Sequence, residues 1–485
     1  MKTFAVNRSK TIFASMKHIA ITFSILLPIL GACTPHHTNV STKIEIPGQF
    51  SNKNSQNFLK IVSTFRWWEN FHNPSLNLIM EKAFQGNLDI KAAYSRLKQA
   101  EAINKKTKSS LWPSIDLEVS ASRSKHKIGN SSITSNLYKT GMAASYEIDL
   151  WHKLSSSRKA AQLETAASEA DLQTAFLTIS AQVAEAFFKL VAVKEKIALT
   201  KEIIRSHQRS AELVEARYIA GTVSALDLYQ SRQNLLGVKA ELPILESELE
   251  AAKNGLAILI GSFPPIEDME ETNFLPEPDF SFEKGLPADL LLNRPDIKAS
   301  LLRVKALDAK VAQAVADRFP AFNIFGNVWY EERELSTLLD FSNILWSIMA
   351  AGSQPVFDAG KRKAEVEFKK AQLEEALAKY KKAVIEGFRD VKNGLAAIKS
   401  ADQNYHIIKE RLKASESSLR MALEHYTSGV DTFLPVLEAQ STHAKVQIGL
   451  VEAKRLRIFS RIQLARALGG SWMQDEAKRA RMKNE

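Results

Sequence analysis

The side chain with the clearest covalent chemistry is the thiol of Cys33, the only cysteine among the 485 residues. A single cysteine forms no intramolecular disulfide and gives no cluster of thiolate ligands for zinc. Upstream lie the charged segment Met16-Lys17-His18 and the apolar run from Ile19 to Leu30, and the small residues Gly31 and Ala32 directly precede the thiol. This order is typical of an export signal, and about twelve apolar residues are too few to span a membrane comfortably.

The tetrad Leu30-Gly31-Ala32-Cys33 resembles a bacterial lipobox. In that motif the thiol is diacylated, the signal peptide is removed and the cysteine becomes the mature N-terminus. Two or three acyl chains anchor a protein far more firmly than one, because each buried methylene contributes about 0.8 kcal/mol. Thr34 rather than aspartate follows the cysteine, so the resemblance implies the outer membrane. An ordinary buried cysteine is the alternative.

Residues arranged for catalysis are missing from the sequence. It contains no nucleophile elbow, no glycine-rich phosphate loop and no His-Glu-x-x-His motif, and His36-His37 is more typical of a linker than of a metal site. We expect no enzymatic activity, no metal and no cofactor besides the lipid on Cys33. The net charge of +11 comes from lysines and arginines mixed with acids on helical segments. This mixing predicts solvated helix faces rather than nucleic-acid binding.

The positions of the prolines indicate where long helices run, because proline inside a helix costs about 3 kcal/mol. Two proline-free segments, Ser155 to Tyr218 and Lys361 to Tyr426, carry small and apolar residues at helical spacing. About sixty residues form a rod of roughly 90 Å. A helix of that length needs a neighbour along its whole length, so we expect packing like that of a coiled coil.

Period-two alternation precedes each rod and predicts four strands. The segments are Ile115 to Ser124, Gly141 to Leu150, Ala321 to Glu332 and Leu345 to Asp358. In the third segment Phe325 and Trp329 fall on the nominally polar face. Lengths of ten to fourteen residues suit tilted membrane strands. A pair of soluble hairpins packed on the helices is the alternative.

A constant offset indicates an internal duplication. Gly429 minus Gly221 is 208, Pro320 minus Pro113 is 207, and Gly469 minus Gly261 is 208. The predicted parts are a signal peptide (1–32), a lipidated linker (33–60), a first repeat (61–262), an inter-repeat linker (263–290), a second repeat (291–470) and a C-terminal tail (471–485). Four strands cannot close a membrane barrel, since the smallest bacterial barrels have about eight. Several copies must therefore assemble.

Motifs along nearly the whole mature chain resemble the TolC-like outer-membrane efflux channels, specifically the lipoprotein branch of NodT and OprM type. Besides the lipobox, they are "RWWENFHNPSLNLIM" from Arg66, "NRPDIKAS" from Asn293, "RFPAFNIFG" from Arg318, "PVFDAGKRKAE" from Pro355 and "ARALGGSW" from Ala465. The resemblance implies a mainly α-helical fold with a β-barrel part. Three chains would close a twelve-stranded barrel joined to a periplasmic tunnel of long antiparallel helical hairpins.

The resemblance also implies a function. The homotrimer would be the passive exit duct of a tripartite pump in the outer membrane, docked through a periplasmic adaptor to an inner-membrane transporter of the RND class, and it would bind no nucleic acid. Small-molecule efflux is favoured. A type I protein-secretion duct and a lipid-anchored periplasmic coiled-coil scaffold are the alternatives.

The two turns that follow the rods are the candidate site. Gly221 and Gly429 suit the positive φ that ends a helix, and Ser224 and Thr432 are expected to cap the next helix. By resemblance these tips dock the adaptor through Gly221, Thr222, Val223, Ser224, Gly429, Val430 and Thr432. The periplasmic gate is expected at Arg217, Tyr218, Asp227, His425, Tyr426, Asp431, Leu434 and Glu438.

Leu434 and Glu438 are four residues apart and share a helix face, so three chains would form a leucine ring and an acidic ring that favours cations. The first copy has Leu226 and Gln230 at these positions. His425 replaces the arginine of the family's Arg-Tyr pair, and a link made through it would depend on pH.

Overall fold

The computed structural model describes residues 66–264, 274–278, 294–337, 340 and 344–484. Cys33, the expected signal peptide and the lipidated linker lie outside the described residues, as does most of the inter-repeat linker. The chain forms two compact units. One contains Ala100–Thr165 and Leu302–Ala378, and the other contains Ala166–Leu301 and Lys379–Glu485 together with residues before Ala100. Each unit takes residues from both halves of the sequence.

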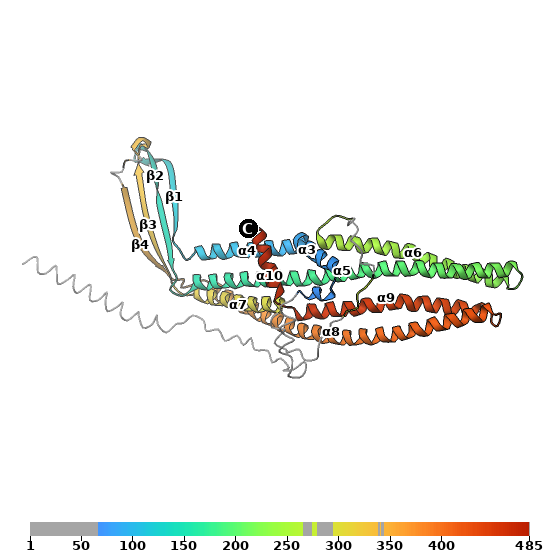
Figure 1. Cartoon of the computed structure of the whole chain (residues 1–485). Helices are drawn as coiled ribbons and strands as arrows, with labels where there is room; N and C mark the ends of the chain where they lie inside the picture. The colour runs from blue at the N-terminus through green and yellow to red at the C-terminus, as the bar shows by residue number, and fades with distance from the viewer. Residues whose placement is uncertain (1–65, 265–273, 279–293, 338–339, 341–343, 485) are drawn as a thin grey trace, which may run out of the picture. The chain divides into compact units, whose positions relative to one another are not determined.

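The helices and strands recur in the same order in the two halves (Figure 1). The first half contains η1 (Trp67–Phe71), α3 (Pro74–Gly86), α4 (Leu88–Ser109), β1 (Ser114–Ile128), β2 (Ser131–Ile148), α5 (Lys153–Ile219) and α6 (Ala225–Ile260). The second contains α7 (Pro295–Ala316), β3 (Ala321–Glu332), η3 (Leu335–Thr337), β4 (Ile344–Ser353), α8 (Lys361–Thr427), α9 (Leu434–Leu468) and α10 (Trp472–Asn484). Both rods, α5 and α8, are 67 residues long.

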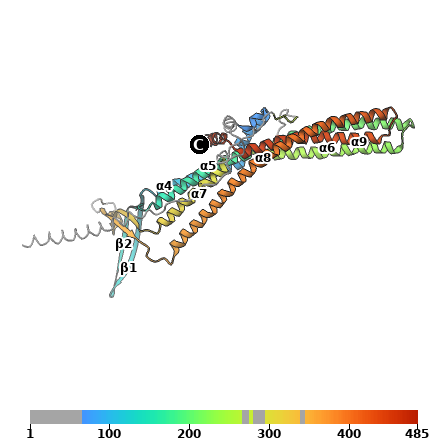
Figure 2. The same cartoon turned by 90° about the horizontal axis from the view of Figure 1, so that it is seen from below.

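The predicted rods are confirmed to within two residues at each end. Helix α6 continues through Pro243, which occupies an exposed position in the helix. Within the second unit α8 runs beside α9, as Figure 1 and Figure 2 both show, and α9 also contacts α6. Helix α5 is the one described helix long and apolar enough to cross a membrane, but 72% of its apolar window is buried inside the protein. It is therefore a core helix.

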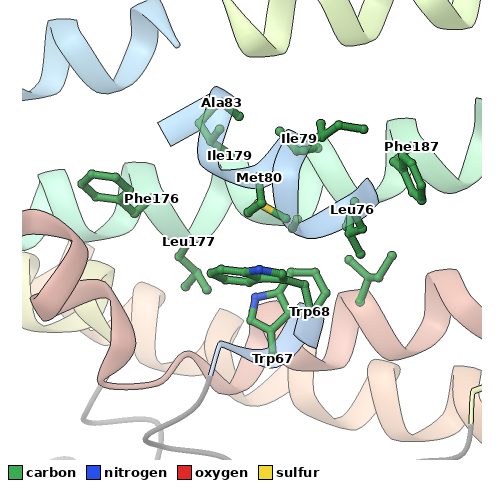
Figure 3. Close-up of a cluster of buried hydrophobic side chains, with 14 of the residues drawn as sticks. Trp67, Trp68, Leu76, Ile79, Met80, Ala83, Phe176, Leu177, Ile179 and Phe187 are labelled. Atoms are coloured by element: carbon green, nitrogen blue, oxygen red, sulfur yellow. The ribbon is translucent and has the colours of Figure 1, made fainter. Parts of the chain in front are cut away.

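The core of the second unit lies where η1, α3, α5 and the end of α9 meet (Figure 3). Trp68 is 1% exposed and makes an edge-to-face contact with Trp472 at 4.8 Å between ring centroids. The Arg66 guanidinium beside it donates to Glu476 at 2.6 Å and lies 2.7 Å from Glu81. The aromatic motif from Arg66 is thus a packing element that joins both ends of the described chain.

The duplication is visible in the contacts that start α4 and α7. Asn87 accepts from the backbone N–H of Ile90 and donates to the carbonyl of Leu259 at 2.8 Å. In the second half Arg294 donates to the carbonyl of Ala467 at 3.2 Å. The two carbonyl positions differ by 208 residues, so each repeat ties the start of one helix to the end of another through a different side chain.

The four strands form one antiparallel sheet in the order β1-β2-β3-β4. β3 has the predicted bounds, but β1 and β2 extend further into their hairpin than predicted. β2 and β4 also end earlier than predicted. Asp149 accepts from the first backbone N–H groups of α5 and Asp358 from those near the start of α8, so both residues cap helices instead of continuing strands.

The register gives the sheet one apolar and one polar face. Leu117 is opposite Met142, Met142 is opposite Val328, and Val328 is opposite Trp346, so one row of apolar side chains crosses all four strands. Leu117 and Trp346 are 70% and 71% exposed. Asp116, Glu118 and Ser145 occupy the other face, as predicted. Trp329 lies on that polar face too, under the Lys139 ammonium at 5.0 Å from the ring centroid.

Gly141 allows this close pairing of β2 with β3. A Cβ atom there would lie within 2.5 Å of the Val328 carbonyl oxygen and of Trp329 Cβ, whereas a Cβ atom at Gly326 would meet nothing within 4 Å. We expect Gly141→Ala to destabilise the sheet by about 1–3 kcal/mol through overpacking. Thermal melting followed by the spectroscopic signal of the β-sheet measures this loss of stability, with Gly326→Ala as the matched control. Equal melting of the two variants would contradict the steric explanation.

Candidate functional site

The two tip turns have the same backbone geometry. Gly221 and Gly429 have φ of 73° and 74°. In the first turn the N–H of Thr222 donates to the Arg217 carbonyl and the N–H of Gly221 to the Tyr218 carbonyl, both at 2.9 Å. The second turn repeats both bonds, with Val430 donating to His425 and Gly429 to Tyr426. Both are Schellman motifs, in which a left-handed residue ends the helix and glycine adopts that conformation without steric cost.

The helices that leave the turns begin differently. Ser224 and Asp227 form a capping box at the start of α6, as the sequence predicted for Ser224. The prediction that Thr432 caps α9 is wrong, because the N-cap is Phe433 and makes no side-chain cap bond. Phe433 is 2% exposed and packs against Tyr426 at 5.2 Å between ring centroids. Burial of the aromatic ring replaces a polar cap.

Arg217 joins the two hairpins of the tip. Its guanidinium donates to the carbonyl of Tyr426 at 2.8 Å and to that of Thr427 at 2.7 Å. It also lies 4.6 Å from the centroid of the Tyr426 ring. The last carbonyls of a helix lack partners within it and carry partial negative charge, so Arg217 of α5 caps the end of α8. Tyr218, by contrast, is 42% exposed.

A small apolar cluster supports this contact. Tyr426 and Phe433 are buried with Val214 of α5, Leu228 of α6 and Val436 of α9. Burial raises the pKa of the Tyr426 phenol above its ordinary value, so the ring that faces Arg217 stays neutral. All four long helices therefore contribute to one cluster at the tip.

The acidic candidates have different surroundings. Asp227 accepts from both the backbone N–H and the hydroxyl of Ser224, so its carboxylate is occupied within the capping box. Asp431 lies 3.5 Å from His425 Nδ1, and both side chains are about half exposed. Leu434 is 50% exposed, and Glu438 is exposed one turn further along α9. Leu434 and Glu438 are thus exposed on the same helix.

A cavity near the tip has a volume of about 610 Å³ and lies between α5, α6 and α9. His207, Gln230, Asn234, Glu241 and Lys445 are among its lining residues. His207 is 4% exposed, and its Nδ1 has no hydrogen-bond partner among the described residues. Burial lowers the pKa of this imidazole, which therefore remains neutral at neutral pH. The wall mixes polar and apolar side chains, and its lining residues include no set arranged for catalysis.

Comparison with known families identifies the class of protein to which this chain belongs. The model of the outer membrane efflux protein family matches residues 79–262 and 286–470. The chain belongs to the outer membrane efflux protein family. Its relatives include the pyoverdine export outer membrane protein OpmQ of Pseudomonas aeruginosa, 28% identical over 96% of this chain and 99% of that protein. The toluene efflux pump outer membrane protein TtgF of Pseudomonas putida is 27% identical over 84% of this chain and 85% of that protein.

Solved structures agree on the fold. The outer-membrane channel OprN superposes with a TM-score of 0.82 at 24% identity, over 90% of this chain and 100% of that one. The predicted fold, long helical hairpins combined with a four-stranded membrane sheet, is thereby confirmed. As a member of the outer membrane efflux protein family, the chain is an efflux duct of the outer membrane.

The two turns of this efflux protein lie at Gly221 and Gly429, as predicted, but some contacts at these turns were not expected from the sequence. Arg217 was expected to act in a pair with the adjacent tyrosine, yet it bonds to α8. The ion pair between Glu215 and Arg232, at 2.7 Å, was not expected either. The ion pair could have been predicted, because Glu215 and Arg232 are 17 residues apart on the two sides of a turn. The acceptors of Arg217 could not, because they are backbone carbonyls 209 and 210 residues away and no local pattern marks them.

We expect Arg217→Ala to loosen the tip of this efflux protein, because two charge-assisted bonds worth about 1.5–3 kcal/mol each are lost. Faster amide hydrogen exchange in residues 425–433 measures this. Arg217→Lys keeps the charge but not the planar fork, so it should restore only part of the protection. Arg209→Ala is the control, because that exposed guanidinium bonds only within its own helix. Unchanged exchange in Arg217→Ala would refute the link.

Proposed function

We propose that three copies of this chain close a twelve-stranded barrel in the outer membrane and continue as a helical tunnel. The observation that carries the proposal is the exposed apolar row across a sheet whose edge strands, β1 and β4, each have one neighbour. Lipid tolerates no unpaired strand edge, so β4 of one copy pairs with β1 of the next. The apolar face contacts lipid and the polar face lines the lumen.

The duct works as part of a tripartite system and has no catalytic activity. The tips, from Gly221 to Ser224 and from Gly429 to Thr432, are the docking region for a periplasmic adaptor, which connects the duct to an inner-membrane transporter of the RND class. The efflux relatives, which match 84–96% of this chain, support the function as a duct. Cys33 carries the lipid anchor, and the repeats divide near residues 262 and 291.

The cargo consists of small organic molecules. Relatives that export pyoverdine and toluene differ greatly in cargo polarity while sharing 27–28% identity with this chain. This breadth supports a duct that selects little beyond size and charge, with the transporter choosing the cargo.

A deletion strain tests the efflux function. Loss of the gene should increase sensitivity to a panel of solvents, antibiotics and other toxic compounds, and the wild-type chain should restore resistance. The purified protein should migrate as a heat-modifiable trimer and conduct ions. An intact trimer without pore activity would indicate a scaffold, and export of a protein without any change in drug sensitivity would indicate a secretion duct.

Leu434 and Glu438 form the narrowest part of the closed duct in this proposal. Both are exposed on α9 directly after the tip turn, and no ion pair among the described residues involves Glu438. In a trimer they become a leucine ring that closes the aperture sterically and an acidic ring that favours cations. Asp431 contributes through its contact with His425, and Arg217 with Tyr426 holds the tip shut.

We expect Leu434→Ala combined with Glu438→Ala to raise single-channel conductance in planar bilayers and to reduce cation selectivity, because both rings are removed. The matched control is Leu226→Ala with Gln230→Ala at the corresponding positions of α6. Conductance equal to that of the wild type in the α9 double variant would reject the gate assignment, as would an equal rise in the control.

A further inference from the structure

The hairpin of β1 and β2 extends beyond the rest of the sheet. β2 pairs with β3 only between Tyr138 and Ile148, whereas its pairing with β1 continues to Ser131 opposite Ile128. Residues 122–137 therefore form a two-stranded extension. With this extension β1 and β2 are 15 and 18 residues long, longer than the ten residues that the sequence predicted for each.

The extension carries all its charged side chains on one face. Side chains alternate along a strand, so Arg123, Lys125 and Lys127 lie on the same face as Leu117 and Val119, which belong to the apolar face of the sheet. The three cations are exposed. Their cross-strand partners are Asn136, Thr134 and Ser132, and the opposite face of β1 carries Ser122, Ser124 and His126.

No acid balances these cations within the extension. The sequence from Val119 to Leu137 contains no aspartate or glutamate. Among the described residues none of the three forms an ion pair. The nearest acid on the same face is Glu332, which pairs with Tyr138. Tyr138 is also opposite Ala121, so this row lies one row closer to the helices than the row of Arg123. The hairpin thus presents unpaired positive charge.

The cations begin where the apolar band ends. Tyr146 and Phe322 mark one end of that face, and Tyr138 and Tyr330 mark the other. Ten residue steps from Ile148 to Tyr138 span about 34 Å, or about 24 Å at a tilt of about 45°, which matches an apolar band of about 25 Å between aromatic girdles. Arg123 is in the next row, where lipid headgroups begin.

We propose that this cationic hairpin face binds the phosphate groups of lipids in the outer leaflet. The inference rests on the proposed membrane position of the sheet. Three cations separated by about 7 Å along one strand face the same side as the lipid-facing row, so they meet headgroups rather than the lumen. A neighbouring copy of the chain pairs through the strand edge and leaves this face open.

The test uses the full-length purified trimer in mixed micelles with diphosphorylated lipid A as the probe. Arg123→Ser, Lys125→Thr and Lys127→Ser together should weaken binding by more than about tenfold. The charge-preserving variant Arg123→Lys, Lys125→Arg and Lys127→Arg should bind like the wild type. The matched control removes three exposed lysines of α8 by Lys370→Gln, Lys381→Gln and Lys399→Gln, and it should also bind normally.

Two further arms identify the ligand. Dephosphorylated lipid A should bind the wild type and the hairpin variant equally, and millimolar inorganic phosphate should not displace the lipid. Equal binding of diphosphorylated lipid A by wild type and hairpin variant would overturn the proposal, as would an equal loss in the α8 control. Displacement by inorganic phosphate would also overturn it, in favour of a free-anion site.

Trimer migration and conductance on the same samples separate this inference from the proposed function. The hairpin variant should keep both. If the hairpin variant loses its trimer while its chains still bind the lipid, the cations serve contacts between copies and the proposal fails. If the wild type itself forms neither trimers nor pores, the proposed function fails instead.

Discussion

The hydrogen-bonding groups along β1 and β4 impose the main constraint on this protein. The sheet has four strands and therefore two edges, and hydrocarbon supplies no water to satisfy them. An exposed apolar face on such a sheet is stable only when other copies complete it. The proposed trimer, the lumen and the helical tunnel all follow from that requirement, because one chain provides only a third of the closed wall.

The helical part meets a different requirement, which is to hold very long helices in register. Each rod ends in a Schellman turn, and the two turns are joined by Arg217 and the buried pair of Tyr426 and Phe433. Duplication supplied two equal turns, and their later divergence gave one a polar capping box and the other an aromatic N-terminus. The first tip is thereby the donor of the cross-link and the second tip its acceptor, with Leu434 and Glu438 exposed beside it.

Membership in the outer membrane efflux protein family agrees with this division of the molecule. The sheet carries an exposed apolar face, and the tip carries the contacts that join the two hairpins. Among the described residues neither contains a set of residues arranged for catalysis, and the cavity beside His207 is lined by uncharged side chains apart from Glu241 and Lys445.

The sequence by itself determined the bounds of α5 and α8, the bounds of β3 and the sorting of side chains between the two sheet faces. These features follow from local periodicity and from glycine and proline, so they are readable in one segment at a time. The tertiary structure decided the rest: that Arg217 bonds to carbonyls of α8, that Phe433 replaces Thr432 as the N-cap, and that Asp149 and Asp358 leave their strands to cap helices. Each depends on a partner or competing contact outside the local pattern, and periodicity carries no information about such a contact.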